Sequence, residues 1–197
     1  ILKLSAEPRQ QLTALLAVRD ASALLKLASK LRSEAGEFLT AMEFFSDVGL
    51  GIALENIPSL VYPLQSRTSF YLLVEAGSGS MQVPLDSILT EVLEWGLSED
   101  VVVDGALAMS EVQRVAFWRL REEQPEGQRR LGLQVKHDIS VPPGSIGEFL
   151  KVANEQCFEL LDGVRINAFG HLGDGNVHYN LSPPIGQKDF SGQENEI

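Results

Sequence analysis

Two of the three histidines of the chain stand in one Gly-rich segment, from Phe169 to Asn180, where they could share a metal ion. Strand-like residues flank the pair Asp174-Gly175, which is favoured in a two-residue hairpin turn because both positions need positive φ. That turn would place His171 directly opposite His178, with Cβ atoms roughly 4.5–5.5 Å apart. We therefore predict that both imidazoles bind one divalent cation, and that a third ligand comes from elsewhere.

Side chains along this hairpin alternate between an apolar and a polar face, as expected for strands. The apolar set is Val164, Ile166, Ala168, Leu172, Val177, Tyr179 and Leu181, and the polar-face set is Arg165, Asn167, Phe169, His171, Asn176, His178 and Asn180. Such a polar face suits a small anionic ligand. The alternative is a solvent-facing sheet surface on which the histidines and asparagines are merely tolerated.

A second strand-like segment, residues 131–141, displays a cation. By alternation Lys136 shares a face with Asp138, whereas His137 has the opposite parity and is predicted to be a packed or edge histidine. If the face of Lys136 adjoins the histidine face, its ammonium would bind a substrate carboxylate beside the metal. The alternative is a solvated lysine paired with Asp138.

The helix predicted before this strand carries a second cation. Ser110 and Gln113 form a capping-box start, and an apolar stripe is predicted at Val112, Val115, Ala116 and Leu120. A separate i, i+4, i+7 stripe joins Arg114, Trp118 and Arg121. In one interpretation Arg121 is a bidentate clamp for a carboxylate; in the other, Trp118 is a core or rim aromatic with arginine packed over it.

Three segments in this order resemble a known family: residues 117–122, 136–142 and 170–178. Together they are similar to the C-terminal substrate domain of FAD-linked oxidases, the family of D-lactate, glycolate and D-2-hydroxyglutarate dehydrogenases. The resemblance covers essentially the whole chain. The sequence Lys-His-Asp-Ile-Ser-Val-Pro at residues 136–142 is most similar to the D-2-hydroxyglutarate branch of the family. D-Lactate and glycolate are the next candidate substrates.

The resemblance implies a role for each matching residue. Arg121 and Lys136 match positions that hold substrate carboxylates, and Asn180 matches a polar residue near the substrate. His171 and His178 match ligands of a divalent metal, usually zinc. In such enzymes a base removes the hydroxyl proton of the 2-hydroxy acid and the hydride from C2 passes to FAD.

The chain also departs from the family pattern. The third metal ligand and the presumed base are a Glu-His pair that we expect downstream of Ile197, so no catalytic residue is assigned within residues 1–197. We interpret these residues as one substrate domain, truncated at both ends and without its flavin-binding domain, and inactive alone. Some relatives have Thr where this chain has Pro125, which affects the choice of substrate.

Length and composition agree with one domain. The 197 residues are 44% hydrophobic, enough for a single α+β core, and the net charge of −11 argues against nucleic acid as a partner. The single cysteine, Cys157, is predicted to be buried and structural. No apolar run approaches the roughly 20 residues that span a bilayer.

The expected partners are the 2-hydroxy acid, the flavin-binding domain of the same protein, and an electron acceptor: an electron-transfer flavoprotein, a quinone or a cytochrome. We expect a location in the cytoplasm, or in the mitochondrion of a eukaryote. Peripheral attachment to a membrane and a homodimer are both compatible with the sequence. The alternative function is a metal- or carboxylate-binding module without catalysis.

The alternation of elements favours an α+β fold, an antiparallel sheet covered by helices in a ferredoxin-like sandwich. Strands are expected at residues 37–45 and 69–76, a strand or helical turn at 13–18, and helices at 22–33, 46–56, 84–95 and from 145 onward. Ser145 and Glu148 would cap the last helix. We predict helices on one face of the sheet only, with the other face closing on the flavin-binding domain.

Overall fold

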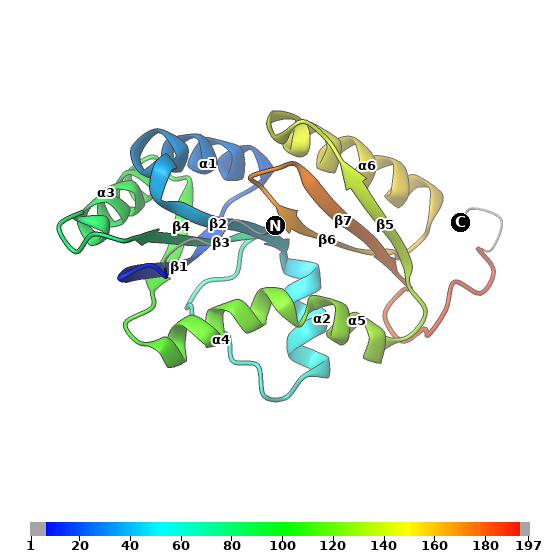
Figure 1. The fold of residues 1–197 in the computed structure, drawn as a ribbon. Coiled ribbons are helices and arrows are strands. Elements are labelled where there is room, and N and C mark those ends of the chain that lie inside the picture. The colour runs from blue at the N-terminus through cyan, green and yellow to red at the C-terminus, as the bar shows by residue number, and fades with distance from the viewer. Residues whose placement is uncertain (1–6, 194–197) are drawn as a thin grey trace, which may run out of the picture.

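The computed structural model describes residues 7–193, which form one seven-stranded sheet with helices on both faces (Figure 1). The strands are β1 (Gln10–Val18), β2 (Leu39–Ser46), β3 (Phe70–Ser78), β4 (Val102–Leu107), β5 (Val135–Ser140), β6 (Arg165–His171) and β7 (Asn176–Ser182). The helices are α1 (Ala21–Ala35), α2 (Asp47–Asn56), α3 (Leu85–Ser98), α4 (Glu111–Glu122), α5 (Gln124–Leu131) and α6 (Ile146–Leu160). The α+β class with an antiparallel sheet is confirmed.

The sheet has the order β4-β1-β3-β2-β6-β7-β5, and every neighbouring pair is antiparallel. Its first four strands, with α1 and α3, repeat the β-α-β-β-α-β connectivity of the ferredoxin-like motif. The last three strands form a second unit, in which α6 connects β5 to β6 and β7 lies between them.

The two units meet at the pairing of β2 with β6. This ladder has only three residue pairs, among them Glu43 with His171 and Phe45 with Phe169. Residues directly opposite in an antiparallel pair present their side chains to the same face. The junction therefore sets residues from distant parts of the chain side by side.

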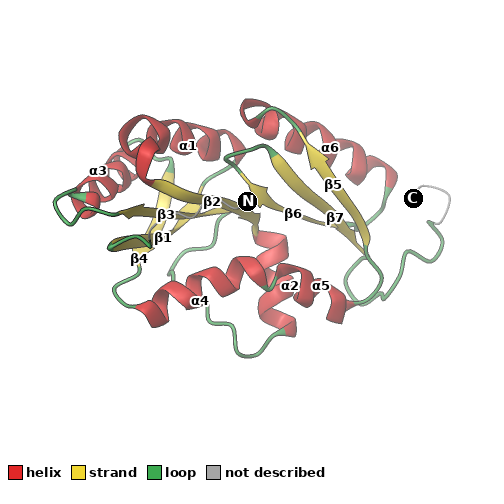
Figure 2. Ribbon diagram, viewed as in Figure 1, coloured by secondary structure: helices red, strands yellow, loops and turns green. Residues whose placement is uncertain are grey.

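Helices cover both faces of the sheet (Figure 2). The larger apolar core packs α1, α3 and α6 on one face, and a second core, which includes Leu50 of α2 and Phe117 of α4, lies on the other. The expectation of helices on one face only was wrong. The strand residues Tyr71, Leu73 and Phe45 are buried against α2 and α4. Because these side chains are apolar, the second face also needs a cover of helices.

The helix starts agree in part with their sequence signals. Ser110 accepts a hydrogen bond from the backbone N of Gln113 and caps α4 as predicted, at 3.3 Å. Ser145, by contrast, makes no capping bond, and α6 continues directly from a 3-10 turn at Pro143–Ser145.

Cys157 on α6 is half-buried and forms no disulfide. Among residues 7–193, no helix has the length and apolar character needed to cross a membrane.

Candidate functional site

A pocket of about 320 Å³ on the α4 and α5 side of the sheet collects four of the five predicted site residues. It is lined by Arg121, Lys136, His178 and Asn180, together with Pro125, His137, Asp138 and Phe169. The fifth residue, His171, lies beside it, with its ring centroid 6.4 Å from that of His178. The structure therefore brings the predicted residues together, although they come from three strands and a helix.

Strand pairing explains this convergence. In the β5–β7 ladder Lys136 lies opposite Asn180 and Asp138 opposite His178. In the β6–β7 ladder His178 lies opposite Phe169. The predicted alternation of faces along these strands is confirmed, because the apolar set of the hairpin lies in the core against α6 and α1.

The predicted register of the β6–β7 hairpin was wrong by two residues. His171 lies opposite Asn176, and residues 172–175 form a four-residue loop in which Gly175 alone has positive φ, at 84°. The reason is the burial of Leu172, which is fully buried and donates its backbone N–H to the carbonyl of Met42 at 2.8 Å. The two histidines are therefore diagonal neighbours on one face rather than directly opposed.

The histidine pair fits part of a metal site. Burial lowers the pKa of His178, with Asp138 acting in the opposite direction, and this favours the neutral imidazole that binds a cation. The Nδ1 atom of His171 lies 2.5 Å from Oε1 of Glu43, which leaves Nε2 for another partner. In the part of the chain that the structure describes, no three His, Cys, Asp or Glu side chains are grouped to hold an ion. The pair could supply two of the four ligands that zinc usually takes.

Arg121 reaches the pocket from α4 and is only 8% exposed. Its Nε donates to Oε2 of Glu43 at 3.1 Å, and its guanidinium lies 4.7 Å from the ring centroid of Phe169. Burial lowers the pKa of Arg121, and the charge of Glu43 opposes this effect. The two terminal nitrogens make no hydrogen bond to another described side chain and can form a fork for a carboxylate.

Glu43 is a site residue that the sequence interpretation missed. It is 6% exposed and bonds both His171 and Arg121. The available signal was a single carboxylate inside the apolar run from Met42 to Phe45. A charge in a buried strand is rarely found without a partner.

Lys136 supplies an exposed cation to the pocket. Among the described residues it forms no ion pair with Asp138, contrary to the alternative interpretation of a paired surface lysine. Asp138 instead accepts from Nδ2 of Asn176 at 2.7 Å and lies 3.5 Å from Nδ1 of His178. The Lys136 ammonium therefore remains available for an anion.

Asn180 is held in one orientation by a chain of amides. Its Nδ2 donates to Oε1 of Gln128 at 2.9 Å, and Nε2 of Gln128 donates to Oε1 of Gln134 at 3.3 Å. Ser182 also donates to that Oε1 atom, at 2.6 Å. One Nδ2 proton is thus used inside the protein, whereas Oδ1 of Asn180 accepts no hydrogen bond among the described side chains and can accept one from a hydroxyl group.

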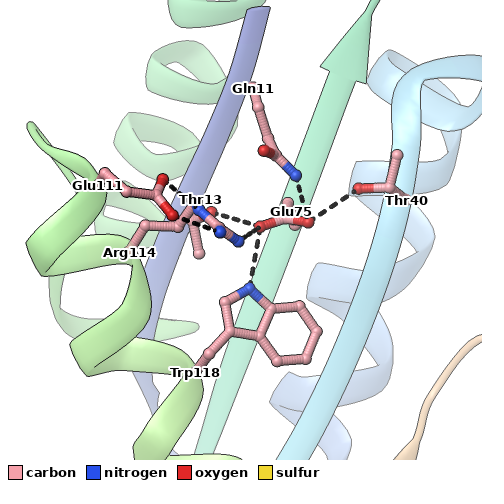
Figure 3. Close-up of polar contacts among 7 residues, drawn as sticks. All are labelled: Gln11, Thr13, Thr40, Glu75, Glu111, Arg114 and Trp118. Carbon is pink, nitrogen blue, oxygen red and sulfur yellow. Dashed lines mark hydrogen bonds and ion pairs between the residues drawn. The ribbon is translucent and has the colours of Figure 1, made fainter. Parts of the chain in front are cut away.

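Next to the pocket, α4 faces a second buried carboxylate, Glu75 of β3 (Figure 3). Trp118 donates its indole N–H to Glu75 at 2.9 Å, and Arg114 approaches the same oxygen at 3.3 Å. Thr13 and Gln11 donate to Glu75 from β1 at 2.8 and 2.7 Å. The stripe of Arg114, Trp118 and Arg121 thus faces the sheet. There its side chains donate hydrogen bonds to Glu75 and Glu43.

The apolar stripe predicted on α4 was in part wrong. Val112 is 79% exposed and Val115 44%, whereas Phe117 and Leu120 are buried. The helix turns its polar stripe inward because the strands beneath it carry Glu75 and Glu43.

We expect Glu75→Gln to lower the free energy of unfolding by about 1–3 kcal/mol at neutral pH, since buried donors lose their acceptor. Burial acts to raise the pKa of Glu75, but the hydrogen bonds from Trp118, Thr13 and Gln11 outweigh it, so the pKa is lowered. The ionised carboxylate thus contributes stability above its ordinary pKa, and this contribution is lost as the pH falls. Urea unfolding at several pH values should show the two proteins converging below about pH 4.

The matched control is Glu111→Gln, because Glu111 also pairs with Arg114 but is solvent-exposed. It should change the stability little at any pH. Equal effects of the two substitutions would contradict the structural role of Glu75.

The sequence profile described as "FAD linked oxidases, C-terminal domain" matches residues 7–193. The chain belongs to this family. A mitochondrial D-2-hydroxyglutarate dehydrogenase of Arabidopsis thaliana is 32% identical over 173 residues, 86% of this chain and 30% of that protein. A putative mitochondrial D-lactate dehydrogenase of Schizosaccharomyces pombe is 30% identical over 168 residues, 81% of this chain and 32% of that protein.

A solved structure shares the architecture of this chain. The fold is similar to p-cresol methylhydroxylase with substrate bound, with a TM-score of 0.62 at 10% identity over 96% of this chain and 41% of that one. At this identity the likeness shows the fold alone. The chain spans about a third of the length of the curated relatives it matches. The family is linked to FAD, and its named relatives are oxidoreductases.

Proposed function

We propose that residues 1–197 form the substrate-binding domain of a FAD-dependent dehydrogenase that oxidises a D-2-hydroxy acid to the 2-oxo acid. The observation that carries the proposal is the pocket in which Arg121, Lys136, His178 and Asn180 converge. D-2-Hydroxyglutarate is the favoured substrate, because it offers two carboxylates to two cations and because the relative from Arabidopsis thaliana bears that name. D-Lactate is the next candidate, followed by glycolate.

Each side chain has a task that follows from its surroundings. Lys136 is unpaired among the described residues and binds a carboxylate as a point charge, while Arg121 offers a planar fork. Oδ1 of Asn180 accepts the hydrogen bond of the substrate hydroxyl. Phe169 lies under the guanidinium of Arg121 and limits its movement.

The histidine pair and the flavin complete the proposal. His171 and His178 would hold a divalent cation, in our proposal zinc, which when bound lowers the pKa of the substrate hydroxyl. FAD, held mainly by a separate flavin-binding domain, would accept the hydride. We place the third metal ligand and the base outside residues 1–197, and we propose an electron-transfer flavoprotein, a quinone or a cytochrome as the acceptor.

The test is dye reduction by the full-length protein with D-2-hydroxyglutarate, D-lactate and glycolate in parallel. We expect turnover with one of these acids that falls on chelation and returns with zinc. Flavin reduction that is indifferent to the chelator would remove the metal from the proposal, and the absence of turnover with every acid would remove the reaction.

The second candidate is a binding module without catalysis, in which the pocket with Arg121 and Lys136 holds a carboxylate and no reaction follows. It predicts that D-2-hydroxyglutarate binds, as measured by calorimetry, while the flavin stays oxidised. Reduction of the flavin by the bound acid would exclude this alternative.

A further inference from the structure

Glu43 lies where the two units of the sheet meet, and it touches a candidate site residue on each side. Its pairing partner across the β2–β6 junction is His171. Arg121 of α4 forms an ion pair with Glu43. Oε1 lies 2.5 Å from Nδ1 of His171, and Oε2 accepts from Nε of Arg121 at 3.1 Å. Each carboxylate oxygen therefore serves a different side chain.

This arrangement determines which nitrogen of His171 carries the proton. An ionised carboxylate only accepts hydrogen bonds, so a neutral His171 must be protonated on Nδ1 and carry its lone pair on Nε2. A lone pair on Nε2 is what a metal ligand requires. The same carboxylate fixes the Nε edge of Arg121 and so leaves its terminal nitrogens for a substrate carboxylate.

We propose that Glu43 is a positioning residue that fixes both the tautomer of His171 and the orientation of Arg121, and so couples the metal half of the pocket to its carboxylate half. This deepens the proposed function and rests on it. The competing explanation is a buried ion pair that only stabilises the junction. In that case the identity of the proton-bearing nitrogen on His171 would not matter.

The substitution Glu43→Gln separates the two explanations. Arg121 is always a donor, so the glutamine carbonyl must face Arg121 and the amide NH₂ must face His171. The amide then donates to Nδ1 and places the imidazole proton on Nε2. We expect the ¹⁵N shifts of His171 in the full-length protein to show this exchange of tautomer, with the signal assigned by its loss in His171→Gln.

The functional readouts follow from the same change. Zinc affinity of the full-length protein, measured by competition with a chelator, should fall about 10-fold to 100-fold in Glu43→Gln. The KM for the acid should rise as well, because Arg121 loses its charged support. Glu43→Asp retains the charge and should recover the wild-type tautomer and part of the zinc affinity.

Glu75→Gln is the matched control, since it removes the other buried carboxylate beneath α4 without touching His171. It should leave the tautomer of His171 unchanged and the zinc affinity within about twofold. An unchanged tautomer in folded Glu43→Gln, or an equal loss of zinc affinity in both variants, would overturn the positioning role. Wild-type protein that neither binds zinc nor oxidises the acid would instead overturn the proposed function. The tautomer measurement would still show whether Glu43 fixes the proton of His171.

Discussion

Alanine in place of His178 is expected to lower kcat/KM of the full-length protein for the proposed 2-hydroxy acid substrate by more than about 100-fold, or about 2.7 kcal/mol of transition-state stabilisation. His178 lines the pocket, with its ring 4.8 Å from that of Phe169 and opposite Asp138 in the ladder. Loss of its imidazole would remove one of the two metal ligands that we propose. Steady-state kinetics with and without added zinc measures the effect, and His171→Ala should match it.

The chain contains its own control for this experiment. His137 belongs to the neighbouring strand but has the opposite parity, and it lies on the edge strand opposite Tyr179, as predicted. His137 lines the pocket, but its Nδ1 lies 3.0 Å from the carbonyl oxygen of Tyr179, and it is not one of the two proposed metal ligands. His137→Ala should therefore lower kcat/KM far less than His178→Ala and leave its dependence on zinc unchanged. A loss as large as that of His178→Ala would contradict the assignment of the metal to His171 and His178.

A second large effect is expected for Arg121→Ala, in stability as well as in substrate binding. Its removal leaves Glu43 buried without its cation, which typically costs about 3–5 kcal/mol of folding free energy. The KM should rise at the same time, because the fork for the carboxylate is gone. Urea unfolding and steady-state kinetics on the same preparation measure the two effects.

Lys136→Ala is the matched comparison, because Lys136 is exposed and makes no ion pair among the described residues. It should raise the KM by about 10-fold or more, as expected for loss of a charge-assisted contact, while the free energy of unfolding stays almost unchanged. A stable Arg121→Ala protein with an unchanged KM would remove Arg121 from the substrate site. An unchanged KM in Lys136→Ala would likewise remove the lysine.

The sequence alone determined which side chains share a face. Alternation placed His178 with Asn180 and Lys136 with Asp138, and helical spacing placed Arg121 on one stripe with Trp118. These properties are local, since the period of a strand or helix fixes the direction of each side chain. They were therefore predictable without knowledge of any neighbour. Whether the face of Lys136 adjoins that of His178 was decided by the pairing of β5 with β7.

Only the tertiary structure decided the registers and the partners. The hairpin register follows the burial of Leu172, whose backbone contacts Met42 and Arg32 from distant parts of the chain. The role of Glu43 depends on a three-pair junction with β6 and on α4 packing across it. Such contacts join segments far apart in the sequence, and their energies depend on what the remaining core buries, which no local period records.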